Sequence, residues 1–127
     1  MIHSDGTKPI YVQIAEWLET EILNGHFKVD EKVYSQYKLA EMFTINPATA
    51  AKGLNILADE KILYTRRGLG KFVTNEAKEI ITDKRKNQKL KGLLDEVALE
   101  AEQLHVREEE LFSMLKESME KRKGDAK

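Results

Sequence analysis

Cysteine is absent from this chain of 127 residues, which excludes disulfide bonds and zinc sites built on thiolates. No run of about eighteen apolar residues is present, so no segment is predicted to span a membrane. The N-terminal residues lack the apolar stretch of a secretory signal, and we therefore expect a cytoplasmic protein. The formal net charge is only −1, which argues against indiscriminate binding to nucleic acids but leaves room for a local basic patch.

Motifs for catalysis are also missing. The three histidines, His3, His26 and His105, are far apart, and no two have the helical spacing that binds one metal ion. The sequence contains no P-loop and no nucleophile elbow. The acidic residues are spread over helix faces close to lysines, which is the pattern of surface charge. We therefore expect no enzyme, no metal site and no cofactor.

The composition changes between Thr74 and Glu76. Both prolines and most of the glycines precede this point, whereas the part that follows is rich in Glu, Lys and Leu. An apolar fraction of 41% with 34% charged residues is typical of a folded, mostly helical protein. The sequence therefore predicts a compact domain over residues 1–75 and a helical tail over residues 76–127, with a frayed C-terminal end.

Two helices are predicted in the first half of the compact domain. The first begins at Pro9, whose missing N–H is harmless at a helix start, and ends before Gly25. Ser35 is a good N-cap for the second helix, and a short strand is expected just before it at Val33 and Tyr34. The first helix has an apolar face with helical spacing, formed by Tyr11, Ile14, Leu18 and Ile22.

A third helix is predicted after Asn46, which can cap it, with Pro47 at its first position. One side of this helix is apolar and is expected to be buried; it carries Ala50, Gly53, Leu54 and Leu57. The other side is small and polar, which suits a close approach to DNA; it carries Ala48, Thr49, Ala51, Lys52 and Asn55. From there Lys52 can reach a base edge or a phosphate, although the same pattern also fits an ordinary solvated helix face.

A short hairpin is predicted over residues 62–73. Two arginines precede a glycine-punctuated tip, and its glycines can adopt positive φ. Arginines at a thin tip suit contact with phosphates or a minor groove, although a hairpin with a solubilising tip has the same composition. Residues 44–71 contain five basic and two acidic side chains, a local charge of about +3. The DNA contacts expected in the hairpin are Arg66, Arg67, Gly68, Gly70 and Lys71.

These features resemble one known family. Residues 9–25 read PIYVQIAEWLETEILNG, which closely matches the opening helix of the winged-helix domain in the GntR superfamily of bacterial transcription regulators. Residues 45–73 read INPATAAKGLNILADEKILYTRRGLGKFV, similar to the YtrA subfamily, in which an Asn-Pro pair begins the recognition helix. The resemblance covers residues 9–73. It implies DNA contacts at Ser35, Tyr37, Asn46, Pro47, Ala48, Thr49, Lys52, Arg66, Arg67 and Gly70.

The start of the second helix departs from the family pattern. Many relatives have Pro-Ser-Glu-Arg there, whereas this chain has Tyr34, Ser35, Gln36 and Tyr37. The arginine that usually contacts the DNA backbone is therefore replaced by Tyr37, whose hydroxyl can meet a phosphate but carries no charge. Ala48 stands where relatives often have a polar residue, so base reading at that position is expected to be steric.

The tail is too short for the large effector-binding domain of most relatives, and its length fits the helix pair through which YtrA-type regulators dimerise. Apolar residues spaced four and three apart form a seam before a break at residues 105–107, and three glutamates begin a second helix. Burial against a second copy is predicted, the alternative being a monomer whose tail folds back. The predicted dimerisation residues are Leu90, Leu93, Leu94, Val97, Ala101, Leu104, Leu111, Phe112, Leu115 and Met119. The basic run from Lys84 to Lys91 is interpreted as a solvated helix face.

The predicted fold is mainly α with a small β-wing: a winged helix-turn-helix domain followed by a two-helix C-terminal dimerisation tail. The predicted function is a dimeric, sequence-specific repressor that binds a double-stranded DNA operator, with room for an unidentified small-molecule effector. The resemblance further implies control of its own operon, with transporter genes. The alternative is a winged-helix module for protein contacts or for architectural, non-specific DNA binding. A winged helix that binds only protein would more typically have an apolar or acidic face on its third helix.

Overall fold

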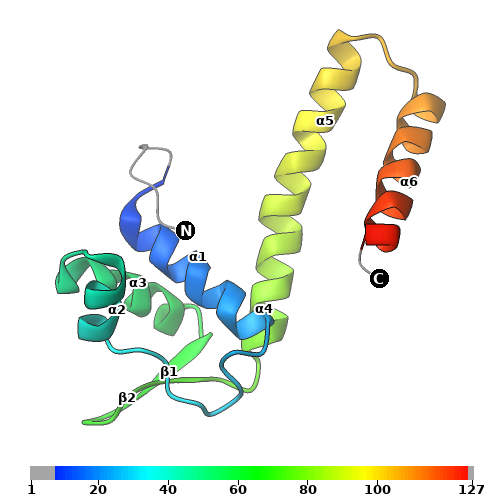
Figure 1. The fold of residues 1–127 in the computed structure, drawn as a ribbon. Coiled ribbons are helices and arrows are strands. Elements are labelled where there is room, and N and C mark those ends of the chain that lie inside the picture. The colour runs from blue at the N-terminus through cyan, green and yellow to red at the C-terminus, as the bar shows by residue number, and fades with distance from the viewer. Residues whose placement is uncertain (1–7, 126–127) are drawn as a thin grey trace. The chain divides into compact units, whose positions relative to one another are not determined.

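A computed structural model describes residues 8–125 and divides the chain into two compact units, residues 1–84 and 85–127, which we call unit 1 and unit 2. Unit 1 is a set of helices with one hairpin (Figure 1). Its elements, in chain order, are α1 (Ile10–Leu23), α2 (Gln36–Phe43), α3 (Pro47–Asp59), β1 (Leu63–Arg66), β2 (Gly70–Val73) and α4 (Ala77–Lys84).

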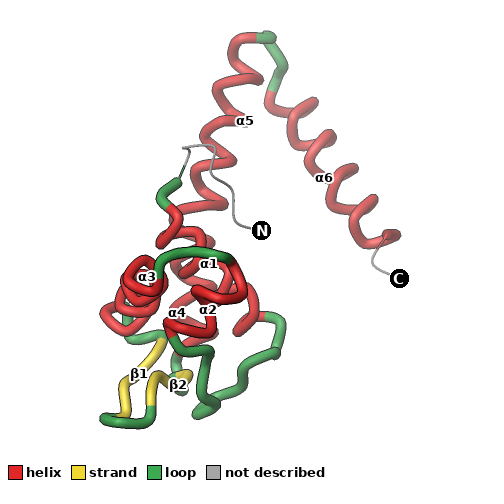
Figure 2. Tube along the Cα trace, turned by 60° about the vertical axis from the view of Figure 1, so that its left-hand side comes forward, coloured by secondary structure: helices red, strands yellow, loops and turns green. Residues whose placement is uncertain are grey.

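The core of unit 1 lies where α1, α2 and α3 pack together, and the antiparallel pair β1–β2 extends from this bundle (Figure 2). The apolar faces predicted for the first and third helices are the faces that are buried. The largest buried side chains include Ile14, Leu18, Ile22, Leu39, Leu57 and Ile62. The predicted fold class, a winged helix-turn-helix that is mainly helical, is confirmed.

Unit 1 extends past the composition change at residues 74–76. After β2 the chain forms α4, which packs against α1 and places Ala77 and Ile81 in the same buried core as α1 and α3. These two residues are four apart, so they lie on one face of the helix. Because the bundle buries that face, α4 belongs to unit 1, which therefore ends at Lys84 and not at residue 75.

The strand expected at Val33 and Tyr34 is not formed. A single antiparallel bridge joins Lys32 to Phe72 of β2. The backbone N–H of Val33 donates to the carbonyl of Lys71 at 3.0 Å. Tyr34 turns away to stack on Trp17, with 6.3 Å between ring centroids, and the chain then enters α2. The ladder therefore stops after one bridge, because the side chain of Tyr34 packs on α1 instead of continuing along the sheet.

Gly53 lies at the closest approach of α1 and α3. A Cβ atom at this position would come within 2.8 Å of the carbonyl oxygen of Tyr11 and 3.2 Å of Cγ2 of Ile14. Real Cβ atoms essentially never come that near to backbone oxygen, so a larger residue would push the two helices apart. The close helix packing that the sequence predicted for Gly53 is present, and it explains why a residue with low helix propensity occupies this position.

Gly53→Ala is expected to lower the free energy of unfolding by up to about 2 kcal/mol. Overpacking costs about 1–3 kcal/mol, and the better helix propensity of alanine returns roughly 1 kcal/mol at most. Urea denaturation at fixed protein concentration measures the difference. Gly92→Ala is the matched control, because Gly92 is also helical and has nothing within 4 Å of the added Cβ. A gain in stability in both variants would contradict the close contact.

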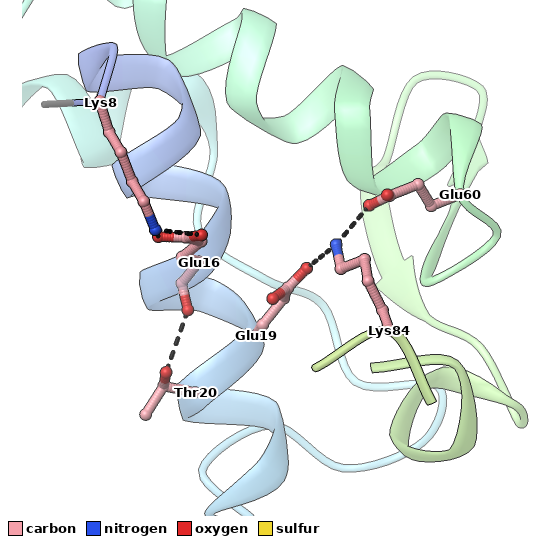
Figure 3. A network of polar contacts seen from close by, with 6 residues as sticks. All are labelled: Lys8, Glu16, Glu19, Thr20, Glu60 and Lys84. Carbon is pink, nitrogen blue, oxygen red and sulfur yellow. Dashed lines mark hydrogen bonds and ion pairs between the residues drawn. The ribbon is translucent and has the colours of Figure 1, made fainter. Parts of the chain in front are cut away.

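A charged network joins three helices of unit 1 (Figure 3). The ammonium of Lys84, at the end of α4, donates to the carboxylate of Glu19 on α1 and, at 2.8 Å, to Glu60, the C-cap residue of α3. Glu19 is only 1% exposed. The interpretation of Lys84 and of the carboxylates as solvated surface charge is therefore wrong for this trio. On the exposed side of α1, Lys8 pairs with Glu16 at 2.9 Å.

The pKa of Lys84 reflects two opposing effects. Burial alone lowers the pKa, because it disfavours the charged ammonium. The hydrogen bonds and the negative charges of Glu19 and Glu60 outweigh burial, so the pKa of Lys84 is raised above its ordinary value. Lys84 is therefore charged at neutral pH and neutralises part of the charge that Glu19 brings into the interior.

Unit 2 consists of helices. A π-helical segment, η1 (Arg85–Leu90), is followed by α5 (Lys91–Gln103) and α6 (Glu108–Asp125). The break predicted at residues 105–107 is present, with His105 at φ 56°. Three acidic residues occupy the first turn of α6, as the sequence indicated, and favour its N-terminal dipole. None of the helices within residues 8–125 is long and apolar enough to cross a membrane.

The apolar side chains of unit 2 are largely uncovered. Ala101 is the one predicted seam residue that is buried, and Leu111 is half-buried. The other predicted seam residues are each 46% exposed or more: Leu90, Leu93, Leu94, Val97, Leu104, Phe112, Leu115 and Met119. Exposed apolar side chains gathered in this way are typical of interaction surfaces.

Candidate nucleic-acid interface

The turn between α2 and α3 presents the start of α3. Thr44 adopts the left-handed conformation, φ 54°, and ends α2 with its N–H donating to the carbonyl of Ala40. The side-chain oxygen of Asn46 accepts a hydrogen bond from the N–H of Ala48 at 2.7 Å, and Pro47 occupies the first turn. Both capping roles predicted from the sequence are thus present, and they fix where the recognition helix begins.

The faces of α3 are oriented as its helical spacing predicted. Its buried residues are Ala50, Gly53, Leu54 and Leu57. Ala48, Lys52 and Asn55 are exposed, and Thr49 and Ala51 are half-buried at the flanks. The exposed face therefore carries one cation, an amide and small side chains, and it carries no carboxylate before Asp59. Such a face can approach a DNA groove closely and donate hydrogen bonds to base edges.

Lys52 makes a contact that the sequence pattern did not reveal. Its ammonium lies 4.1 Å from the centroid of the Tyr11 ring on α1. This is a cation–π distance, and at an exposed site such a contact contributes about 0.5–1 kcal/mol. Tyr11 therefore holds the side chain of Lys52 toward the start of α1 in the free protein. Leaving the ring would cost less free energy than one good base contact contributes.

The hairpin forms a narrow wing. Arg66 belongs to β1 and pairs with Gly70 of β2, so the tip itself consists of residues 67–69. Gly68 has φ 79° and Gly70 has φ 121°, so both glycines have the positive φ that the sequence predicted for the hairpin. The Arg66 guanidinium lies 5.2 Å from the centroid of the Phe72 ring. Arg67 is exposed at the tip, from which it can meet a phosphate or enter a minor groove.

Two further contacts stiffen the wing. The ammonium of Lys71 donates to the hydroxyl oxygen of Thr65 across the pair of strands at 2.9 Å. The hydroxyl of Tyr64 donates to a carboxylate oxygen of Asp30 at 2.7 Å. That hydrogen bond, with burial and the charge of Asp30, raises the pKa of Tyr64, while Arg66 opposes the shift. The wing is thereby anchored to the loop before α2, a contact that residue spacing alone could not indicate.

The start of α2 places the remaining predicted contacts beside the wing. Ser35 caps α2, since its hydroxyl oxygen accepts from the N–H of Lys38 at 3.1 Å. Tyr37 is 70% exposed, so its hydroxyl is free to meet a phosphate. The predicted contact residues thus come from three places that face solvent: the start of α2, the outer side of α3 and the wing. No group of acidic, histidine or cysteine side chains within residues 8–125 is arranged to hold a metal ion.

Comparison with known proteins identifies the family. Residues 10–73 match the gntR family of bacterial regulatory proteins. The HTH-type transcriptional repressor YtrA of Bacillus subtilis is 30% identical over 119 residues, which cover 94% of this chain and 91% of YtrA. The chain belongs to the GntR family. Its relatives are DNA-binding transcription regulators and not enzymes.

Two further comparisons agree with this assignment. The HTH-type transcriptional repressor NagR of Bacillus subtilis is 33% identical over 118 residues, which cover 90% of this chain. The chain spans about half of NagR, 49% of its length. The crystal structure of a GntR-family regulator from Bacteroides thetaiotaomicron has a TM-score of 0.77 and 27% identity, covering 90% of this chain and 99% of that one. The GntR fold therefore continues beyond the winged helix into unit 2.

Proposed function

We propose that this GntR-family protein is a dimeric, sequence-specific repressor that acts in the cytoplasm on a double-stranded DNA operator. The observation that carries the proposal is the capped helix α3, whose outer face has small side chains and no carboxylate before Asp59 and lies beside a wing tipped by Arg67. Such a helix fits a major groove, and the wing suits the neighbouring backbone or minor groove. Repression is supported by YtrA and NagR, both named repressors.

The proposal of a homodimer rests on unit 2. Its apolar seam on α5 and its apolar face on α6 are about half exposed in a single chain. Closed dimers are the commonest way in which such surfaces are buried. Two copies would present two recognition helices to two half-sites, as helix-turn-helix dimers do. The similarity to YtrA along nearly the whole of both chains supports a shared arrangement.

Regulation is the finer part of the proposal. We infer from the resemblance to YtrA that the operator lies at the promoter of the protein's own operon, together with transporter genes. A small-molecule effector would act by changing the affinity for this operator. Footprinting of the protein on its own upstream region tests the first statement, and protection confined to unrelated DNA would contradict it.

Two substitutions separate base reading from backbone contact. Lys52→Ala is expected to cost about 1–3 kcal/mol on the operator and less on a scrambled duplex, because Lys52 lies on the base-reading face. Arg67→Ala is expected to weaken both duplexes more evenly, because Arg67 lies on the wing. It should also flatten the log–log salt dependence by about one unit for each copy that binds.

The measurement is a pair of titrations at several salt concentrations, with an operator selected in vitro by the unmodified protein and a scrambled duplex. Tyr11→Leu is a useful companion, because it frees the Lys52 side chain and leaves its charge in place. Equal losses on both duplexes for Lys52→Ala would make Lys52 a phosphate contact. Unchanged affinities in both Lys52→Ala and Arg67→Ala would contradict the proposed function.

A further inference from the structure

A cleft of about 190 Å³ lies between the wing and the start of α2. The residues of its lining that can meet an anion are two lysines and several hydroxyl-bearing side chains, among them Lys32, Lys71, Ser35, Tyr37 and Thr65. None of the described residues that line it is acidic. The first two residues of α2 also take part, so the positive end of that helix dipole lies at the cleft. The cleft thus combines a largely apolar lining with cationic and hydroxyl groups that can hold an anion.

Lys32 is a cation of this cleft that was not among the DNA contacts predicted from the sequence. Its backbone forms the single bridge to Phe72, which places it at the base of the wing. Its side chain then crosses the wing at Gly70, where a Cβ atom would come within 2.9 Å of Cε and 3.7 Å of Nζ of Lys32. The absence of a side chain at Gly70 gives the lysine its path. Lys32 is exposed and forms no ion pair with a described residue.

We propose that Lys32 and Lys71 hold one backbone phosphate of the operator in this cleft, and that Lys32 supplies the positive charge that Tyr37 does not carry. This inference rests on the proposed function. Lys71 retains donors for a phosphate, since an ammonium has three and Thr65 accepts only one. The hydroxyl of Tyr37 adds a neutral donor at the same place. DNA is the occupant that the position favours, because the cleft is bordered by the wing and by the start of α2, two of the places that carry the predicted DNA contacts.

Lys32→Gln tests the charge. It is expected to weaken binding to operator and to scrambled duplex by a similar factor, about 10-fold at 0.1 M salt. The log–log salt slope should fall by about 0.9 for each copy bound. Lys28→Gln is the matched control, because it removes the same charge from the same loop at a residue that does not line the cleft. It is expected to leave both affinities unchanged.

A second variant separates the charge of Lys32 from its packing on Gly70. Adding Tyr37→Arg to Lys32→Gln returns a cation to the cleft without returning the lysine stem. We expect this double variant to regain the affinity and the salt slope of the unmodified protein. Failure to regain either would mean that Lys32 only shapes the wing, and it would overturn the inference.

The remaining outcomes distinguish this inference from the proposed function. Unchanged DNA binding in Lys32→Gln, with a clear loss in Arg67→Ala, would overturn the phosphate cleft and leave the proposed function intact. No DNA binding by the unmodified protein would overturn the proposed function itself. Calorimetric titration with inorganic phosphate tests whether the cleft binds a free anion instead of a DNA phosphate. Saturable binding that Lys32→Gln abolishes, with DNA affinity unchanged, would assign the cleft to a small ligand and overturn the DNA contact.

Discussion

Leu94→Asp combined with Val97→Asp is expected to make the protein monomeric and to weaken operator binding by about 100-fold or more. Leu94 and Val97 are three residues apart on α5, so they share a face, and they are 47% and 46% exposed in the single chain. In a dimer through this face, four carboxylates would enter an apolar contact, at a cost no dimer of this size could offset. Each copy would then bind one half-site alone and lose an effective concentration that contributes about 10²–10⁴ to affinity.

Sedimentation velocity at micromolar concentration measures the oligomeric state, and the operator titration measures the functional loss. Gln88→Asp combined with Gln103→Asp is the control, because it adds the same charge to polar, exposed positions of unit 2. This control is expected to remain dimeric and to bind normally. Sedimentation of the unmodified protein as a monomer would remove the basis of the prediction. A dimer that survives in Leu94→Asp with Val97→Asp would place the interface elsewhere.

The parts of the interface that could be predicted are those set by local chemistry. Ser35 and Asn46 were identified as caps because their short polar side chains can accept from the next free N–H groups, and both do so. The exposed side of α3 followed from helical spacing, since apolar residues three and four apart must share a buried face. The positive φ at Gly68 followed from the need for a tight tip.

The parts that could not be predicted depend on which helices meet in space. Lys52 was assigned to the outer face of α3, but its position over Tyr11 arises only where α1 and α3 touch. Lys32 became a candidate phosphate contact only once the structure showed its side chain crossing Gly70. Glu19 was interpreted as surface charge together with the other carboxylates, whereas its side chain faces Lys84 on α4. Pairwise spacing along one helix carries no information about such contacts.

The trio of Glu19, Glu60 and Lys84 ends unit 1 at the residue where its last helix stops. Lys84 is the final residue of α4, and the π-helical turn η1 begins at the next residue. π-helical turns are rare and are often found where a helix has a functional task. The ion pairs fix the end of α4 against α1 and α3, so the chain leaves the DNA-binding unit from a defined point. Loss of these ion pairs is therefore expected to lower the stability of unit 1 and to leave the DNA contacts of the folded protein unchanged.

Lys84→Met is expected to lower the free energy of unfolding by about 3 kcal/mol, near the lower end of the range for breaking a buried ion pair. The reason is the carboxylate of Glu19, which is 1% exposed and would lose its ion pair with the ammonium. Methionine keeps most of the packing of the lysine stem, so the loss reports mainly the charge. Glu60 contributes less, because its side chain is 34% exposed and can turn to water.

Urea denaturation at fixed protein concentration, followed by the fluorescence of Trp17, measures this loss. Lys8→Met is the matched control: it breaks an exposed pair with Glu16 and should change stability by about 0.5 kcal/mol or less. Lys84→Met with Glu19→Leu should recover most of the loss, since an apolar pair leaves no buried charge.

Because the pKa of Lys84 is raised in the folded state, its contribution to stability is fully present below the ordinary lysine pKa of about 10.4. It is lost as the pH rises through the raised pKa, so the gap between the unmodified protein and Lys84→Met should close there. Equal losses in Lys8→Met and Lys84→Met, or no recovery in the double variant, would show that Lys84 does not stabilise unit 1 by neutralising Glu19.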